Sequence, residues 1–301
     1  ALNNLGTAQW DLGRFHDAWA THADAVRVCR ELGDVRGEGD NIDNMGGVRW
    51  ALGDMAGAIA MYETALELRR GSDDPWGVAI SLGNLADAHR SAGELDQSLV
   101  WAREALDVSR AAGIARTEAT SLQALGATQF ELGLIADALD ALTAADAAHV
   151  ALGDRPNSVE TRATHARALL ANDDVIGARS LADSLLRDVR PDDAPRMRQT
   201  VYQCAFECWC DAPTPHDAIG HLARAQLAMM EYLDPFDDDD RDRIVSGHPL
   251  HRRTSAAVQR HAERVEVRLA AAGTPLGRTL RDDDRVTVTW SLSEPADTTI
   301  T

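Results

Sequence analysis

Three cysteines and two histidines lie close together in the sequence, and cysteine with histidine is the donor set of a structural zinc site. The five residues are Cys204, Cys208, Cys210, His216 and His221. Cys204 and Cys208 share one helix face because they are four positions apart, whereas Cys210 points elsewhere. Zinc sites favour two cysteines separated by two residues, and this chain has no such pair. Buried structural thiols are therefore the better interpretation, and we expect neither a metal nor a cofactor.

An acidic run is the second candidate for chemistry. Asp238, Asp240 and Asp242 begin like a calcium-binding loop. The match then fails, because Arg243 stands where the loop requires glycine and Pro249 where it requires glutamate. The chain also has no nucleophile elbow, no phosphate-binding loop and no dinucleotide fingerprint. We interpret the acidic run as solvated charge and predict that the chain is not an enzyme.

The composition excludes several classes of partner. The chain has 301 residues, of which 45% are apolar, enough for a substantial core. Its formal net charge is −18, and all 30 basic residues are arginine. This acidity opposes binding to nucleic acid and to anionic membranes, since both need clustered positive charge. Aromatic residues make up only 5%, and abundant alanine favours closely packed helices.

The sequence also bears on the compartment and on the extent of the chain. No run of about 18 apolar residues is present, so no membrane span is expected. No signal peptide is recognisable, and the four cysteines are too few for a secreted disulfide scaffold. We therefore expect a cytoplasmic protein. Ala1 already lies in a helical pattern, which suggests a piece cut from a longer protein.

The elements that would position any site come from a repeat of 40 residues. Its first recognisable position holds Leu5, Met45, Leu85 and Leu125. The next position is small, which lets a second helix pack close to the first: Gly6, Gly46, Ala86, Gly126 and Ala166. A turn position holds Gly13, Gly53, Gly93, Gly133 and Asp173. Glycine there ends a helix in the left-handed conformation, where a side chain would clash. Six copies in one register predict an all-α array of helical hairpins.

We expect each repeat to be two helices of roughly 17 residues joined by short turns. The expected hairpins lie near residues 1–34, 35–74, 75–114, 115–154, 155–193 and 194–233. An acidic linker over 234–249 follows, and then a capping helix over 250–273 that covers the end of the array. In the tail at 274–301, Val286, Val288, Trp290 and Leu292 alternate with polar residues, which is a strand pattern.

The repeat resembles the tetratricopeptide repeat. That family's signature pairs Leu-Gly in the first helix with an alanine, and an aromatic residue four positions later, in the second. Met45-Gly46 with Ala58 and Tyr62 fits this signature. The 40-residue period resembles the long-repeat branch, which includes kinesin light chains and the mitotic adaptor LGN. The resemblance implies a right-handed α-α superhelix of about six hairpins, whose first helices line a concave groove.

Asparagines recur on the face that the resemblance assigns to this groove. Asn4, Asn44 and Asn84 occupy one position of the first three repeats, and amides suit the backbone of an extended peptide. The full predicted groove set is Asn3, Asn4, Asp40, Asp43, Asn44, Asn84, Asp87, Gln123 and Glu131. Its acids favour a basic or extended peptide, and the family's lysine clamp for a carboxylate has no counterpart here. The alternative is that the asparagines cap or bridge neighbouring helices.

These observations predict a non-catalytic scaffold that holds a protein or peptide partner in the groove. Two alternatives stay open. One is a sensor or regulatory domain of a bacterial transcription regulator whose DNA-binding part lies outside this chain. The other is a self-assembly module in which the C-terminal strand pairs two copies. Over Leu280–Asp297 the tail resembles segments that follow repeat arrays in some actinobacterial helix-turn-helix regulators.

Overall fold

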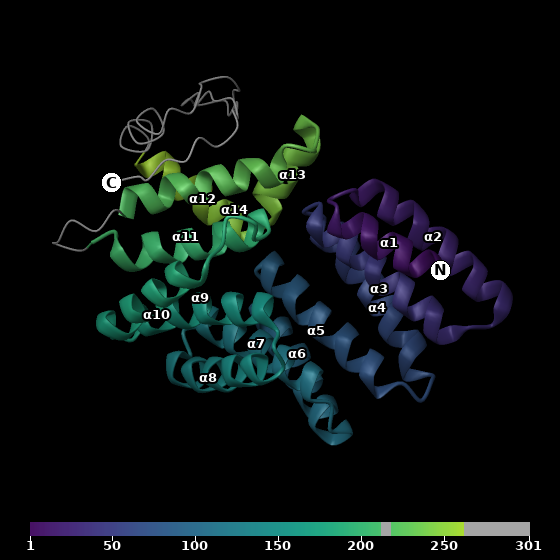
Figure 1. Ribbon diagram of the computed structural model, residues 1–301. Coiled ribbons are helices and arrows are strands. Elements are labelled where there is room, and N and C mark those ends of the chain that lie inside the picture. Colours follow the sequence, from purple (N-terminus) through teal and green to yellow (C-terminus); the bar gives the residue numbers. More distant parts are fainter. Residues whose placement is uncertain (212–217, 262–301) are drawn as a thin grey trace.

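The computed structural model describes residues 1–211 and 218–261, and all regular elements in these residues are α-helices (Figure 1). The first six are α1 (Leu2–Asp11), α2 (Phe15–Leu32), α3 (Val35–Ala51), α4 (Met55–Arg70), α5 (Pro75–Ala92) and α6 (Leu95–Ala112). The next six are α7 (Ala115–Glu131), α8 (Ile135–Ala151), α9 (Arg155–Ala171), α10 (Val175–Asp188), α11 (Pro195–Trp209) and α12 (Ala218–Leu233). Two shorter helices follow, α13 (Asp238–Gly247) and α14 (Pro249–Arg260). The all-α fold class is confirmed, while the predicted terminal strand lies outside the described residues.

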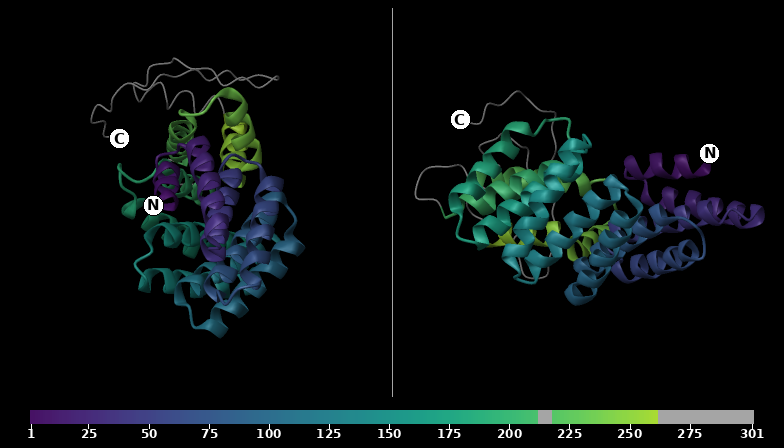
Figure 2. Two further views of the ribbon diagram at one scale, coloured as in Figure 1. Left: turned by 90° about the vertical axis from the view of Figure 1, so that its right-hand side faces the viewer. Right: turned by 90° about the horizontal axis from the view of Figure 1, so that it is seen from below.

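The helices stack in sequence order as a curved solenoid. Each helix packs mainly against its neighbours along the chain, and the odd-numbered helices also contact one another. In Figure 1 the chain runs from α1 and α2 on the right, through α6 at the bottom and α10 on the left, to α12 at the top. Figure 2 shows this curvature from two further sides. The curvature brings side chains of distant repeats to one central space.

The turn chemistry expected from the sequence sets the helix boundaries. The turn glycines adopt positive φ angles, and Asp173 adopts the same left-handed conformation at φ 60°. This confirms the predicted left-handed turns. Helices α3, α4, α5, α9 and α10 are each preceded by an aspartate that caps the helix. Its carboxylate accepts a hydrogen bond from the backbone N–H three residues further on. These aspartates are Asp34, Asp54, Asp74, Asp154 and Asp174. Each such cap stabilises its helix by about 1 kcal/mol.

Glycines inside the first helices allow close contact with the second helices. A Cβ atom on Gly46 would lie 2.5 Å from Cε1 of Tyr62. A Cβ atom on Gly126 would lie 2.8 Å from Cγ of Leu142. Real Cβ atoms do not approach other atoms this closely. The small residue that recurs every 40 positions therefore fixes the spacing within a hairpin.

Replacing Gly46 with alanine should destabilise the protein by about 1–3 kcal/mol, because overpacking outweighs the better helix propensity of alanine. Gly83 is the matched control, since it lies inside α5 and a Cβ atom there would meet nothing within 4 Å. Gly83→Ala should leave stability unchanged or raise it by up to about 1 kcal/mol. Urea unfolding of both variants measures the difference. Equal effects at the two positions would contradict the packing argument.

The stretch 234–249, which the sequence predicts as an acidic linker, contains α13 instead. The carboxylate of Asp237 accepts a hydrogen bond of 2.9 Å from the backbone N–H of Asp240 and so caps this helix. Asp238 lies in the same first turn, where the positive end of the helix dipole stabilises negative charge. Ile244 is fully buried. The acidic run therefore starts a docked helix, and the capping-helix prediction corresponds to α14 within the described residues.

Helix α13 closes the solenoid between its two ends. Phe15 of α2 and Val48 of α3 belong to one apolar cluster with Leu233 of α12, Phe236 and Ile244. The rings of Phe15 and Phe236 stack with their centroids 5.4 Å apart. Residues from the start and the end of the array thus share a core. The sequence pattern gave no indication of this closure.

Candidate binding groove

The first three repeats surround an open hollow that we call the amide groove. It has a volume of about 380 Å³. Its lining residues are Thr7, Trp10, His22, Asp43, Asn44, Gly47, Trp50, Tyr62, Asn84 and Asp87. All except His22 and Tyr62 come from α1, α3 and α5, the first helices of their hairpins. Four predicted groove residues, Asp43, Asn44, Asn84 and Asp87, therefore come together here.

The three laddered asparagines do not behave alike. Asn44 donates a hydrogen bond of 2.9 Å from Nδ2 to Oδ1 of Asn3, which bridges α1 and α3. The side-chain amide of Asn84 makes no hydrogen bond with any other described residue, and Asn84 lines the groove. Asn4 is exposed and does not line the groove. Bridging thus describes the Asn3–Asn44 pair, whereas Asn84 is open to a ligand.

The predicted acids are largely neutralised by arginines. The buried guanidinium of Arg69 binds Asp43 and, at 2.7 Å, Asp40. Burial raises the pKa of Asp43 to about 6, although the charge of Arg69 opposes this shift. Asp87 and Glu131 lie outside this cluster and pair with a different arginine. The groove is therefore less acidic than the sequence suggests.

Two tryptophans form apolar walls of the amide groove. Trp10 packs against Phe15 with ring centroids 5.0 Å apart. Trp50 donates a hydrogen bond of 3.2 Å from Nε1 to Oγ of Ser91. The guanidinium carbon of Arg196 lies 4.5 Å from the centroid of the Trp50 ring. Both tryptophans are only partly buried, so each keeps some ring surface toward the groove.

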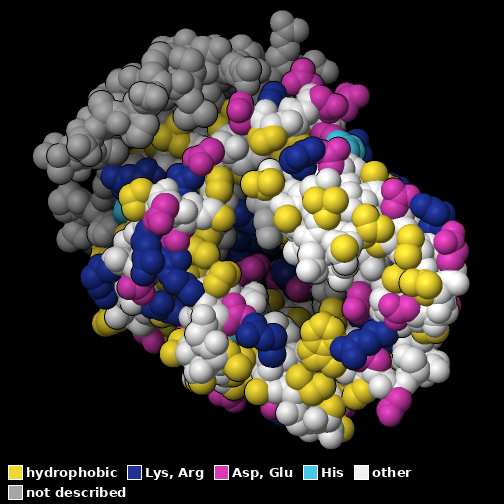
Figure 3. All heavy atoms as spheres, turned by 45° about the vertical axis from the view of Figure 1, so that its right-hand side comes forward, with side chains coloured by type: hydrophobic (Ala, Val, Ile, Leu, Met, Phe, Trp, Pro, Cys, Tyr) yellow, Lys and Arg dark blue, Asp and Glu magenta, His cyan; other side chains and the backbone are white. Residues whose placement is uncertain are grey.

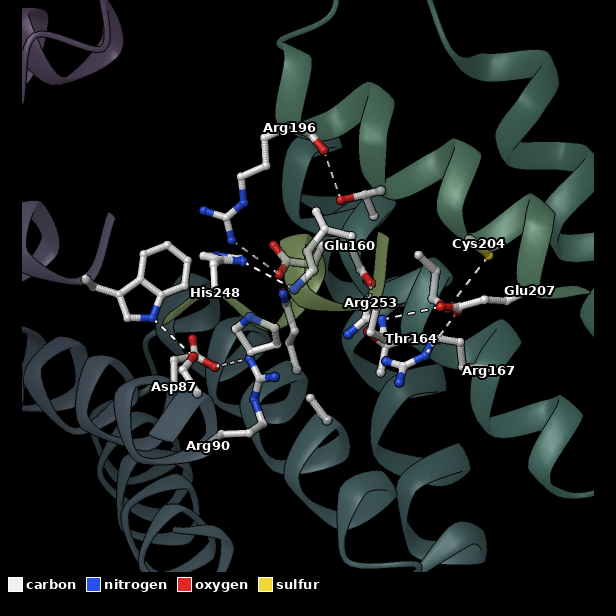
Figure 4. Close-up of a pocket in the computed structure, with 18 residues that line it drawn as sticks. Asp87, Arg90, Glu160, Thr164, Arg167, Arg196, Cys204, Glu207, His248 and Arg253 are labelled. Carbon is white, nitrogen blue, oxygen red and sulfur yellow. Dashed lines mark hydrogen bonds and ion pairs between the residues drawn. The ribbon is translucent and has the colours of Figure 1, made fainter. Parts of the chain in front are cut away.

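A second hollow, which we call the arginine pocket, continues inward from the amide groove and shares Trp50 and Asp87 with it. Its volume is about 60 Å³. Four arginines from four helices line it, namely Arg90 of α5, Arg167 of α9, Arg196 of α11 and Arg253 of α14. Figure 3 shows basic and acidic side chains in the central hollow of the molecule. Figure 4 shows the side chains of these arginines pointing into a common space beside His248.

Ion pairs hold the arginines in place. Arg90 lies 3.0 Å from Asp87 and 3.0 Å from Glu131. Burial alone would lower the pKa of Arg90, but these two carboxylates raise it above its ordinary value. Gln123, the remaining predicted residue, lines the same pocket. Glu131 thus acts on the pocket only through Arg90, because it does not line the pocket itself.

On the opposite side, two arginines share one acid. Arg167 and Arg253 each lie 3.3 Å from the carboxylate of Glu207. Burial lowers the pKa of Arg167, and the positive charge of Arg253 lowers it further. Arg196 approaches only Glu160 among the described acids, at 4.0 Å. Positive charge is therefore incompletely compensated on this side of the pocket.

Two buried histidines belong to the α13–α14 segment, and His248 lines the pocket. His248 caps α14, and its ring lies edge-on to Trp50 with centroids 4.6 Å apart. His251 is fully buried beside the ring of Tyr232. Burial lowers the pKa of His248 well below its ordinary value, and the nearby Arg196 lowers it further. The same two causes lower the pKa of His251 to about 3.

The sequence analysis missed the arginine pocket. Its four arginines occur at unequal spacings in different repeats, and one of them belongs to the terminal helix α14. No periodic signal links them.

Neither a metal-binding cluster nor a membrane-spanning helix is found in the described part of the chain. No group of three His, Cys, Asp or Glu side chains there is arranged to hold a metal ion. Cys204 and Cys208 are buried in the core between α9 and α11, as predicted. Cys210 is exposed, so the prediction of a buried thiol is wrong for that residue. None of the described helices combines the length and the apolar character that a bilayer crossing requires.

Comparison with known proteins identifies the repeat. The tetratricopeptide repeat family model matches residues 1–71 and, in an overlapping match, residues 37–111. No curated protein matches the chain. Among solved structures, the chain is similar to BtubC from P. vanneervenii, with 17% identity and a TM-score of 0.55 over 73% of this chain and 90% of that one.

Two further solved structures are similar to most of this chain. One is a signal transduction ATPase with a tetratricopeptide repeat sensor from Pyrococcus horikoshii, with 17% identity and a TM-score of 0.57. That match covers 78% of this chain and 36% of the ATPase, so this chain spans about a third of it. The other is a Rap protein in complex with Competence and Sporulation Factor, with 13% identity, a TM-score of 0.57, and coverage of 90% of this chain and 69% of that one. At these identities the likeness shows the fold alone.

Proposed function

We propose that this chain, whose residues 1–71 and 37–111 match the tetratricopeptide repeat model, is a scaffold that holds an extended segment of a partner protein in the amide groove. The family is generally non-catalytic, which supports a binding role. The observation that carries the proposal is the amide of Asn84, which lines the groove and makes no hydrogen bond with another described residue. An amide offers both a donor and an acceptor, so it pairs with any peptide backbone.

The rest of the groove supports an extended and largely backbone-recognised ligand. Asn44 supplies a second amide one repeat away, and its Oδ1 remains available after Nδ2 has bonded to Asn3. The ring faces of Trp10 and Trp50 offer apolar contact area beside these amides. Because Arg69 already neutralises Asp43, a strongly basic peptide gains less than the sequence suggests.

A peptide library displayed on phage, followed by fluorescence polarisation with the selected peptide, tests this proposal. The Asn44→Ala/Asn84→Ala variant should bind about tenfold more weakly, because two hydrogen bonds of about 0.5–1.5 kcal/mol each are lost. Asn4→Ala is the matched control, since Asn4 is exposed and lies outside the groove. Circular dichroism verifies that both variants keep their helicity. Unchanged affinity of the double variant would exclude the amide groove as the peptide site.

A regulatory sensor is the second candidate function. Two similar folds belong to a signal transduction ATPase with a tetratricopeptide repeat sensor and to a Rap protein in complex with Competence and Sporulation Factor. In this chain the groove of the first repeats contacts the α13–α14 segment through Trp50 and His248, so a ligand there would act on the closure. Hydrogen exchange of α13, with and without the selected peptide, separates a sensor from a passive scaffold.

The four cysteines form no disulfide bond, which supports a reducing cytoplasm as the compartment.

A further inference from the structure

We propose that the arginine pocket binds a tetrahedral oxyanion, either inorganic phosphate or the phosphoryl group of a small phosphorylated compound. The pocket lies inward of the amide groove and does not depend on the partner peptide. Its guanidinium groups reach it from α5, α9, α11 and α14. No periodic requirement of the repeat places arginine at these four positions. A binding site explains why so many charges are gathered in one small space.

Charge is the first argument. The pocket is lined by four arginines and by three acids, Asp87, Glu160 and Glu207, in a chain whose net charge is −18. Glu131 lies outside the lining and also pairs with Arg90, so the excess of positive charge is confined to the other three arginines. Asp87 is engaged by Arg90 at the mouth of the pocket. Deeper inside, three arginines share two glutamates, one of which lies 4.0 Å from its arginine. An anion in this space would meet uncompensated positive charge in surroundings of low dielectric, where the attraction is strong.

Hydrogen-bond capacity is the second argument. A guanidinium group offers five N–H donors, so the three acids use only part of the donors that surround the pocket. The Nε–H of Arg90 is buried and has no acceptor among the described residues. The hydroxyl of Ser91 accepts from Trp50 and keeps its own proton available for donation at the pocket wall. An oxyanion would satisfy such donors, whereas an empty pocket leaves them to water.

Shape decides between classes of oxyanion. A carboxylate is planar and is matched by one or two guanidinium groups, whereas a phosphoryl group presents oxygens in several directions. Here the guanidinium groups come from four helices and point inward from different sides (Figure 4). The volume of about 60 Å³ accommodates a small group and excludes a peptide chain. These features favour a compact tetrahedral anion.

Phosphate titration of the protein, in the absence of any peptide, tests the proposal. The ³¹P resonance of inorganic phosphate should broaden when protein is added. Phosphate should also raise the midpoint of thermal unfolding saturably, by about 3–5 °C at high occupancy. Glycerol 3-phosphate in a parallel arm distinguishes a small phosphorylated compound from the free ion. Chloride and acetate at matched ionic strength should produce no saturable effect. An equal response to acetate, or none to either phosphate compound, would overturn the proposal.

Variants assign the binding to this pocket. Arg253→Gln should weaken phosphate binding at least tenfold while folding persists, because Glu207 retains Arg167 as its partner. Arg187→Gln is the control, since Arg187 lines a separate arginine-rich hollow between α9 and α10 together with Arg155, Arg162 and Arg190. If Arg187→Gln abolished phosphate binding and Arg253→Gln did not, phosphate would bind in the hollow between α9 and α10, and the proposal for the arginine pocket would be overturned. A failure here would leave the peptide proposal intact, because that proposal is tested on the asparagines.

Discussion

Replacing Arg69 with methionine is expected to lower the free energy of unfolding by about 3–5 kcal/mol, since removing one member of a buried ion pair leaves an uncompensated charge. Arg69 is 2% exposed and Asp43 5% exposed. The guanidinium also donates to the backbone oxygen of Gly77 at 2.7 Å and to Oγ of Ser81 at 2.9 Å. These contacts join α3, α4 and α5 through one side chain. Guanidinium chloride unfolding, monitored by circular dichroism, measures the loss.

Two further variants separate the buried charge from general loss of a side chain. Arg110→Met removes an arginine that is largely exposed and pairs with Glu118 at 2.9 Å, and it should change stability by less than about 1 kcal/mol. Adding Asp43→Asn to Arg69→Met should recover part of the loss, because the stranded carboxylate is then neutral. If Arg69→Met and Arg110→Met had equal effects, the buried pair would not contribute as argued.

Acidification from pH 7 to pH 5 should destabilise the protein by about 3–4 kcal/mol through His248 and His251 alone. Both are buried, and the positive charge of Arg196 disfavours protonation of either ring. Arg90 and Arg253 act in the same direction on His248. Their folded pKa values therefore lie below the ordinary value of 6.5. We expect the α13–α14 segment to release first.

The direction of this effect follows from proton binding. As the pH falls below about 6.5, histidines in the unfolded chain take up protons that the buried histidines do not, so unfolding is favoured by about 1.4 kcal/mol per group and pH unit. For His251 the loss continues until the pH approaches its folded pKa of about 3. Asp43 acts oppositely, because its folded pKa of about 6 lets the folded state take up a proton first. One such group only partly offsets the two histidines.

The variant His251→Phe isolates the histidine contribution. Phenylalanine keeps a ring beside Tyr232 but cannot be protonated, so the loss of stability between pH 7 and pH 5 should shrink by about 2 kcal/mol, the contribution of one buried histidine. Thermal unfolding midpoints across this pH range provide the measurement, and only the difference in slope matters. Parallel curves for wild type and variant would show that His251 is not the group responsible.

The repeat could be predicted because its residues act locally. Gly46 and Gly126 are small where a neighbouring helix passes, and Gly13 and Gly53 adopt left-handed turns. Such constraints involve residues within one hairpin, so they recur at the period of the hairpin and are visible in the sequence. The all-α solenoid follows from them.

The groove could be predicted only in part. Asn44 and Asn84 line it because residues at one repeat position fall on one face of the array. Asn4 does not, because its side chain is exposed outside the hollow. From the sequence, Asp40 and Asp43 are predicted to be available to a bound peptide. Only the tertiary structure shows that Arg69 reaches across from α4 and neutralises them.

The sequence by itself determined the helical hairpins, their turns and the face that carries the amides, because those features depend on contacts at short, periodic separations. The tertiary structure alone decided the closure by α13 and the meeting of Arg90, Arg167, Arg196 and Arg253. The small rotation from each hairpin to the next accumulates along the array, and its sum brings residues from distant repeats together. No pattern within one repeat encodes this accumulated rotation, so the arginine pocket cannot be recognised from the sequence.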